Sequence, residues 1–482
     1  MMKFRGLQIA LLLLPLSAVR PQDNSRILRL HGGRVDLRCQ LANNLSHGPG
    51  GRAAGLGNSI TSFHPDAAMA SLNPAALVRV RDPVASVDFT PPLSLDLSAL
   101  IDVESEIRSS TDSAIEDYRD PQIDLQYSRL GAALQQQSQL GALLLAFPVR
   151  GTLLCTYYTR PFDLRLSSRL TAFDAQIYTT LQVSDEADDI YFNSRIDGLT
   201  RLEVGASSFG WSAARRVSPR LSFGFGMQRT RVEVGGFGRL NVDGTMLYAG
   251  RENTFNDPND SWINTLNQSF DGRYSGAGWG WRAGVLFETR PALQLALSFD
   301  WQPEISASGA AEILNYTVPA LNLDALGQED GEDEILEAEE LKLSQLTLTR
   351  AVENPVHSIL TVKLPKTLRL GAAYSWKRMA LHLTWVRGFD VLALCYGEDE
   401  IGLERRHSLT AGFDAGLVQL GAGYTRMNKT VSGSEKLGEQ QELTLPLLSL
   451  GSHIPIVSGL DLDVLWFALP LPLLKLHFTW VF

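Results

Sequence analysis

The chain has 482 residues, enough for several ordinary domains or for one large sheet closed on itself. Its formal net charge is -10, which argues against a general nucleic-acid binder, because such proteins need a basic surface. The three cysteines, Cys39, Cys155 and Cys395, lie far apart and match neither a metal site nor a redox pair. We therefore predict no metal, no cofactor and no disulfide-built fold.

The first residues have the order of a secretory signal. Lys3 and Arg5 precede a short apolar run that ends in small residues at Ser17-Ala18. We predict a signal peptide over 1–18, cleaved near Ala18, and hence export across the inner membrane. No later stretch has about 18 unbroken apolar residues, so we expect no transmembrane helix.

The stretch that follows, 19–82, is rich in glycine, alanine and asparagine and lacks sustained alternation. At its heart is "ASLNPAAL" (Ala70–Leu77), with Asn73, Pro74 and Ala75 in the middle. Such a run is compatible with an ordinary turn. It also suits a compact plug, because small residues allow backbones to approach closely.

From residue 83 onward, apolar and polar residues alternate again and again. Leu293–Trp301 is a clear example, with leucine and aromatic residues on one face and polar residues on the other. These segments are about ten residues long, the length a tilted strand needs to cross a bilayer. Tryptophan and tyrosine recur at their ends, and short and long connections alternate, as in outer-membrane barrels.

The chain ends on one of these alternating segments, with Phe478, Trp480 and Phe482 on one face. This ending resembles the signal that the barrel-assembly machinery reads in outer-membrane proteins. A hydrophobic edge strand would invite aggregation in water, whereas closure in lipid removes the edge. We therefore predict the barrel-assembly machinery and outer-membrane lipid as partners.

Counting these segments predicts an all-β fold: a transmembrane antiparallel β-barrel of about 14 strands over 83–482, with the 19–82 segment as a hatch in its lumen. The predicted strands are 83–98, 141–149, 152–165, 201–214, 219–232, 276–288, 291–301, 366–376, 379–388, 407–415, 417–427, 443–453, 460–469 and 471–482. The longest outer loop is expected at 302–365. It contains the acidic run 328–340, which we interpret as a solvated segment, with an ion or partner site as the other possibility.

Three stretches of the sequence resemble the FadL family of outer-membrane long-chain fatty acid transporters, which includes the toluene and xylene channels. Gly55–Leu77 is similar to the family's hatch, with its Asn-Pro-Ala at Asn73, Pro74 and Ala75. Gly278–Ile313 and Leu364–Trp385 are similar to two of its strand pairs. The resemblance extends over nearly the whole mature chain and implies the family's 14-stranded barrel.

The resemblance implies passive uptake of long-chain fatty acids or other hydrophobic small molecules by a monomer in the cell outer membrane. The ligand would reach a pocket beside the hatch and leave when the hatch shifts. In the family it exits through a gap at a kinked third strand, and Pro161 is our candidate for that kink. The other interpretation is that Pro161 only ends a strand.

Because successive residues of a strand face opposite sides of the sheet, we expect Arg282, Asp300 and Arg369 to face the lumen. Either arginine is a candidate partner for a carboxylate head group. An enzyme is disfavoured, because the histidines are scattered and no nucleophile elbow is present. The alternative function is a FadL-like barrel that serves type IX-type protein secretion as a shuttle or anchor.

Overall fold

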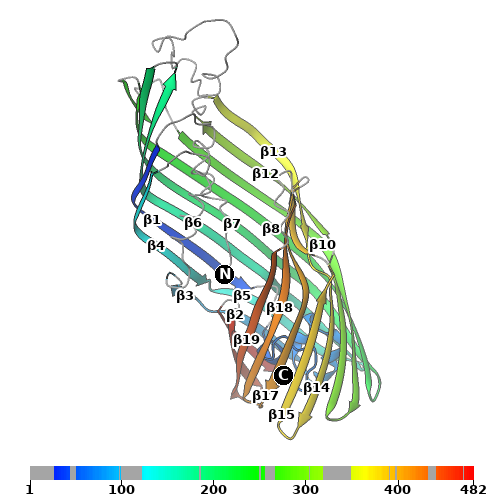
Figure 1. The fold of residues 1–482 in the computed structure, drawn as a ribbon. Helices are drawn as coiled ribbons and strands as arrows, with labels where there is room; N and C mark the ends of the chain where they lie inside the picture. Colours follow the sequence, from blue (N-terminus) through cyan, green and yellow to red (C-terminus); the bar gives the residue numbers. More distant parts are fainter. Residues whose placement is uncertain are drawn as a thin grey trace.

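A computed structural model describes residues 26–43, 50–96, 98, 122–183, 186–248, 251–255, 266–302, 304–317, 349–389, 391–396, 399–432, 441–469 and 472–482. Most of them lie in strands (Figure 1). The exceptions with regular structure are α2 (Arg52–Gly55) and two 3-10 helices, η1 (Ala67–Ser71) and η2 (Pro74–Arg79). In this part of the chain, no helix is both long and apolar enough to cross a membrane.

Among the described residues, fourteen strands close into an antiparallel ring. In order around the ring they are β2 (Val84–Thr90), β5 (Gln139–Val149), β6 (Thr152–Val183), β7 (Glu186–Ser218), β8 (Leu221–Tyr248), β10 (Leu266–Arg290), β11 (Leu293–Trp301), β14 (Thr367–Trp376), β15 (Met379–Gly388), β17 (Asp399–Asp414), β18 (Val418–Ser432), β19 (Gln441–Val457), β20 (Leu460–Leu469) and β21 (Leu473–Val481). Pairing of β21 with β2 closes the ring. The predicted β-barrel of about 14 strands is confirmed.

The outer face of the ring is apolar over a continuous belt. On β8, for example, Phe223 and Phe225 point outward and are exposed, whereas Ser222 and Gln228 point inward and are buried. Aromatic side chains on neighbouring strands touch across the belt, as Phe225 and Trp281 do with ring centroids 6.4 Å apart. An apolar band with aromatic residues is the surface that a bilayer-spanning barrel presents to lipid.

At the long-loop end, part of the sheet continues beyond the ring (Figure 1). Besides the long strands β6, β7, β8 and β10, the extension contains β1 (Arg26–Asn43), β3 (Leu93–Asp96), β4 (Gln122–Gln136), β9 (Arg251–Phe255), β12 (Glu304–Thr317), β13 (Thr349–Lys363) and β16 (Val391–Tyr396). The strands β12 and β13 lie in the stretch 302–365 that the sequence analysis assigns to the longest loop. They extend the wall because the loop's two stems pair with each other and, through β12, with β10.

The strand β1 corrects the expectation of an unbroken plug over 19–82. It lies between β4, with which it is parallel, and β6, with which it is antiparallel. The residues Arg34–Leu41 alternate polar with apolar, with Val35 buried and Arg34 exposed. This local alternation makes a wall strand, although the surrounding composition is that of a plug. The signal peptide 1–18 and the acidic run 328–340 lie outside the described residues.

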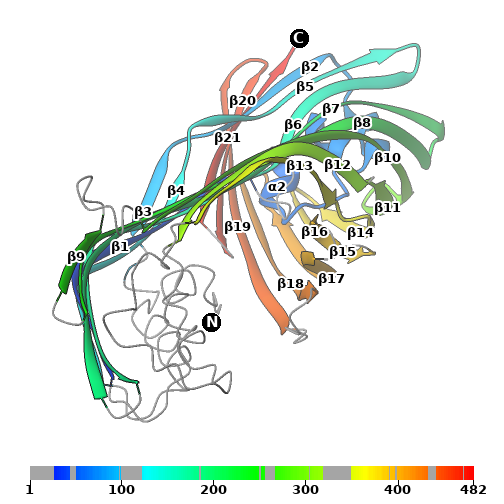
Figure 2. The same ribbon diagram turned by 90° about the horizontal axis from the view of Figure 1, so that it is seen from above.

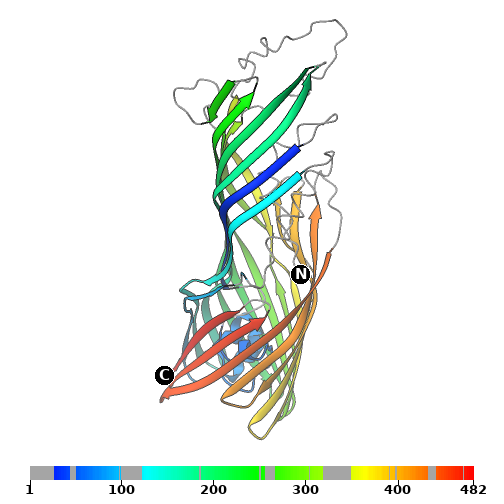
Figure 3. The ribbon, with the colours of Figure 1, turned by 60° about the vertical axis from the view of Figure 1, so that its left-hand side comes forward.

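Residues 50–82, here called the inner segment, occupy the bore of the ring (Figures 2 and 3). The main hydrophobic cluster of the molecule forms where this segment meets the inward face of the wall. It includes Met69, Ala70 and Leu77 from the segment, and Leu144 and Leu286 from the strands. The action of this segment as a hatch stays a prediction.

Candidate functional site

Asn73 organises the centre of the inner segment. It is fully buried, and its side chain caps η2: Oδ1 accepts a hydrogen bond from the backbone N–H of Ala75 at 3.2 Å. The Nδ2 group donates to the carbonyl of Ile60 at 3.1 Å. Pro74 takes the first helical position, where its missing N–H costs nothing. The Asn-Pro-Ala sequence therefore builds a compact helix start.

Two glycines of the barrel wall allow the N-terminal end of η2 to pack closely against the strands. A Cβ atom built at Gly284 of β10 would collide with the Asn73 side chain, and one at Gly224 of β8 would collide with the backbone of Pro74 and Ala75. Only glycine allows the strand backbone to approach this closely. The wall surface of Gly224 and Gly284 is called the glycine wall below.

Hydroxyl groups of the same side of the wall satisfy carbonyls of the inner segment. The Ser212 hydroxyl donates to the carbonyl of Ala70 at 3.0 Å, and the Ser298 hydroxyl donates to that of Leu72 at 2.7 Å. The Arg282 Nη1 group reaches the Ala70 carbonyl at 3.5 Å. Irregular backbone inside a barrel needs such partners, because a buried carbonyl without one is costly.

On the opposite side of the bore, polar and charged side chains hold the segment. Ser449 Oγ and Thr410 Oγ1 donate to the carbonyls of Gly55 and Gly57 at 2.9 and 3.1 Å. The His382 ring lies within hydrogen-bond distance of hydroxyls in the segment, 2.9 Å in the case of Thr61. On β2, Asp88 accepts from the backbone N–H of Gly50 at 3.2 Å. These four wall residues, together with Lys475, which lies 3.5 Å from Asp88, form what is called the polar wall below.

A fully buried carboxyl group also folds the segment upon itself. Asp66 caps η1, where Oδ1 accepts from the N–H of Ala68 at 2.8 Å, and Oδ2 accepts from that of Ala53 at 3.3 Å. Burial raises the pKa of Asp66 above its ordinary value, and the nearby His477 and the two backbone N–H groups oppose this rise.

A cavity of about 160 Å³ lies where the inner segment meets the wall. It is lined by Gly57, Asn58, Ser71, Leu72, Gly141, Thr159, Arg160, Pro161, Ala206, Ser208, Gln228, Thr230, Arg282, Asp300, Gln302, Leu364, Pro365, Thr367, Arg369, Val386, Ser408, Thr410, Thr425 and Leu447. All four wall residues that the sequence analysis selects for ligand and exit, Pro161, Arg282, Asp300 and Arg369, are among them.

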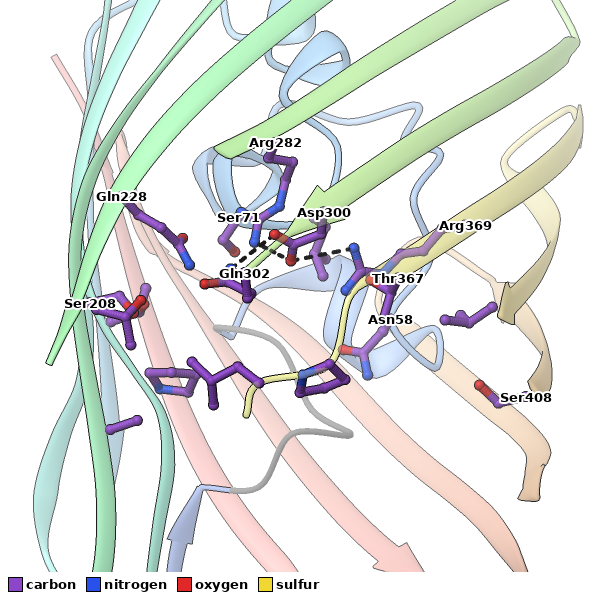
Figure 4. Close-up of a pocket in the computed structure, with 18 of the residues that line it drawn as sticks. Asn58, Ser71, Ser208, Gln228, Arg282, Asp300, Gln302, Thr367, Arg369 and Ser408 are labelled. Carbon is purple, nitrogen blue, oxygen red and sulfur yellow. Dashed lines mark hydrogen bonds and ion pairs between the residues drawn. The ribbon is translucent and has the colours of Figure 1, made fainter. Parts of the chain in front are cut away.

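Charged groups gather around Asp300 on one side of this cavity (Figure 4). Arg282 Nη2 lies 2.6 Å from Asp300 Oδ2, and Arg369 Nη1 lies 3.8 Å from the same oxygen. The Gln302 Nε2 group donates to Asp300 Oδ1 at 2.9 Å. With two guanidinium groups and one carboxylate, the cluster has a formal charge of about +1, so it favours an anionic group in the cavity.

Several polar atoms of the cavity lining are buried without a hydrogen-bond partner among the described residues: Arg282 Nε, Gln302 Oε1 and Thr367 Oγ1. A buried polar group without a hydrogen-bond partner lowers the stability of the fold by roughly 1–3 kcal/mol. A polar ligand group, or water, in the cavity recovers this cost. The lining is therefore suited to a head group with both donor and acceptor capacity.

An apolar surface adjoins the charged cavity. It consists of inward side chains of the sheet: Ala206, Val232, Val234, Ile305, Ala307, Leu360, Val362 and Leu364. Ala206 and Leu364 belong to this apolar surface and also line the cavity, so the two are continuous. The cavity therefore has a charged side and, at Ala206 and Leu364, an apolar side, and it is called the amphipathic cleft below.

Pro161 lies on β6 beside the cavity, but the strand does not end there. It continues to Val183 through a register shift between Thr159 and Phe162, beyond the predicted strand 152–165, so Pro161 does not merely end a strand. A bulge accommodates proline because no ladder N–H is needed at that position. At the same level the strand that pairs with β6 changes from β5 to β1. Arg160 Nη1 donates a hydrogen bond to Gln139 Oε1 at 2.9 Å across this junction.

Several solved structures are similar to the chain over most of its length. The Ralstonia pickettii toluene transporter TbuX has 12% identity and a TM-score of 0.45, with 91% of this chain and 99% of that chain covered. A Pseudomonas aeruginosa FadL homologue has 15% identity and a TM-score of 0.44, with 92% and 98% covered. The monoaromatic hydrocarbon channel CymD has 13% identity and a TM-score of 0.46, with 92% and 99% covered. No family model matches the chain, and no curated protein matches it.

Sequence reasoning missed some polar members of the site. Gln302 and Thr367 are the clearest, because each flanks a strand end where alternation gives little guidance. Within the described residues, no group of three or more ligating side chains is arranged to hold a metal.

The predicted assembly signal lies at the closing strand of the ring. The strand β21 carries Phe478 and Trp480, whose rings stack at 6.1 Å. Phe482 donates its N–H to the carbonyl of Pro83 at 3.0 Å. The role of these C-terminal residues in barrel assembly stays a prediction.

Proposed function

We propose that the chain is an outer-membrane channel for passive uptake of hydrophobic small molecules, and that long-chain fatty acids are its ligand class. The observation that carries the proposal is the amphipathic cleft, in which a positively charged cavity adjoins an apolar wall. A fatty acid matches this arrangement, because its carboxylate meets the arginines while its chain lies on the apolar side chains.

The volume of the cavity supports a ligand that is held partly inside it. A cavity of about 150 Å³ in another protein holds one benzene molecule, and the volume here is about 160 Å³. The charged end therefore accommodates a carboxylate with its first few carbons. The remaining chain would leave the cavity from its apolar side, at Ala206 and Leu364.

The position of the inner segment in the bore favours a gated path rather than an open pore. It packs against both the glycine wall and the polar wall, so a ligand in the cavity passes only if the segment shifts or if the wall opens sideways. The junction at Arg160-Pro161 is the proposed side exit, because a hydrogen bond to Gln139 spans it where β6 changes partner. The apolar belt around the ring supports delivery into the bilayer from such an exit.

The head-group assignment is tested with Arg369→Gln, which keeps a polar side chain and removes one charge. Uptake of a labelled long-chain fatty acid is expected to fall about tenfold, which corresponds to the loss of one charge-assisted hydrogen bond. Uptake of the fatty alcohol of equal chain length is expected to change little. Equal losses for acid and alcohol would contradict carboxylate recognition, and an unchanged rate for both would remove Arg369 from the site.

The exit is tested with Pro161→Thr, because threonine supplies the ladder N–H that proline lacks. We expect slower uptake with an unchanged affinity for the fatty acid, since the cavity charges stay in place. Gly205→Ala, on the neighbouring strand β7 and opposite Asp163 of β6, is the control for a backbone change next to the same strand, because an added Cβ meets open space there. Uptake at the normal rate in a fully folded Pro161→Thr barrel would reject the side exit.

A gene deletion in the cells used for the uptake assay distinguishes uptake from a role in protein secretion. Deletion of the gene is expected to lower fatty acid uptake while the set of secreted proteins stays the same. A secretion defect with normal uptake, together with co-purification of a secretion component, would favour the shuttle or anchor alternative.

A further inference from the structure

The short-turn end of the barrel has an uneven distribution of charge. Each hairpin turn from β5–β6 to β14–β15 along the ring contributes cations, and the turns β17–β18 and β19–β20, both within the described residues, contribute none. The exposed cations are Arg150, Arg215, Arg216, Arg220, Arg290, Lys377 and Arg378. They are called the basic arc below.

A single carboxylate lies among the cation-bearing turns in the part of the chain that the structure describes. Glu288 is mostly buried and already bridges two arginines, Arg216 at 3.2 Å and Arg79 of the inner segment at 3.0 Å. The remaining cations of the arc extend from exposed turn and strand-end positions. A chain with a net charge of -10 thus concentrates positive charge on one half of one rim.

Turn geometry does not explain these cations. Arg150 and Lys377 have φ angles of 48° and 56°, in the left-handed region that favours glycine, asparagine and aspartate in tight hairpins. Long basic side chains are uncommon at both positions. Their presence calls for a reason outside the turn itself.

The neighbourhood of the arc identifies the partner. The outward side chains next to it are apolar and exposed, including Val149, Val217, Phe223, Phe287 and Tyr374. The arc therefore lies at the edge of the belt that meets the acyl chains, at the level of the lipid head groups. Cations at this level attract anionic lipids, and arginine pairs with phosphate through two hydrogen bonds.

We propose that the basic arc binds the phosphate head groups of acidic phospholipids in the leaflet at the short-turn end, which is the periplasmic leaflet when the long loops face outward as the sequence analysis expects. The inference rests on the membrane placement in the proposed function but not on the identity of the cargo. It also predicts that the barrel is surrounded unevenly, with acidic lipid enriched along β5 to β15 and not along β17 to β20.

The test measures lipids that stay bound to the purified full-length protein. The barrel is equilibrated with equal amounts of phosphatidylglycerol and phosphatidylcholine of the same acyl chains, and bound lipids are counted by native mass spectrometry. The arc variant combines Arg150→Asn, Arg220→Gln, Arg290→Gln and Arg378→Gln. The matched control combines the same number of exposed outward cations near the other end: Arg201→Gln, Arg229→Gln, Arg231→Gln and Arg273→Gln.

We expect the wild-type barrel and the control to retain phosphatidylglycerol over phosphatidylcholine by about fivefold or more, and the arc variant to lose this preference. A wild-type barrel without preference, or an arc variant that keeps it, would overturn the proposal. Arc-dependent binding of an acidic peptide such as polyglutamate, without lipid preference, would assign the arc to a protein partner instead. No cargo is present in this experiment, so its outcome is independent of the uptake assays.

Discussion

The two sides of the bore hold the inner segment in different ways. On the glycine wall, the absence of side chains at Gly224 and Gly284 lets the strands approach the segment closely. On the polar wall, hydroxyl, imidazole and carboxylate groups reach across to carbonyl, hydroxyl and N–H groups of the segment. Both sides combine the two kinds of contact: Ser212 and Ser298 add hydrogen bonds on the side of the glycine wall. Gly412 and Gly421 allow close backbone approach on the side of the polar wall, which differs mainly in its buried imidazole and its carboxylate–ammonium pair. The combination suits the proposed hatch action, because shape sets the position of the segment while polar contacts exchange readily with water.

The largest effect is expected from a change in the polar wall. Lys475 and Asp88 are both fully buried, and Lys475→Met leaves the Asp88 carboxylate without its buried cation. Removing one partner of a buried ion pair costs about 3–5 kcal/mol. The midpoint of urea unfolding in detergent should therefore fall sharply. In the double variant Lys475→Met/Asp88→Asn most of the loss should return, and a single variant as stable as wild type would show that the pair contributes nothing.

A smaller effect is expected on the glycine wall. Gly284→Val places side-chain atoms where Asn73 and Pro74 now lie, and overpacking of this kind costs about 1–3 kcal/mol. The barrel should remain folded while the inner segment loses its close packing against the glycine wall. Limited trypsin digestion measures this, because Arg52 and Arg79 in the segment become accessible. The control is Gly205→Val, where an added Cβ meets open space; equal protection in both variants would contradict the close contact.

The smallest effect concerns pH and compares the wild-type protein with the variant Asp66→Asn. Because burial raises the pKa of Asp66 in the folded state, its contribution to stability is fully present below the ordinary value of 3.8 and is lost as the pH rises through the raised value. Asparagine keeps the cap on η1 and does not ionise. The urea midpoint of wild type relative to the variant should therefore decrease as the pH rises above about 4. A constant difference would show that Asp66 does not titrate in this range.

Much of the fold was predictable because one physical rule acts on every strand. Lipid outside and a filled bore inside impose opposite preferences on alternate residues, so the alternation in the sequence marks each strand of the ring. The same rule pointed Arg282, Asp300 and Arg369 inward. It applies equally to Arg34–Leu41, where the plug-like composition of the surrounding residues conceals the alternation.

What remained beyond the sequence is the pairing of distant residues. Arg282 lies directly opposite Asp300, and Arg369 lies opposite Ser298, only because of the register between β10, β11 and β14. A shift of one residue would have turned these side chains to the lipid. The sequence by itself determined which faces are apolar and how many strands cross the belt, since each of these is a local property. The tertiary structure alone decided that glycines meet Asn73 and that arginines share one carboxylate, because register and closure depend on all the strands together.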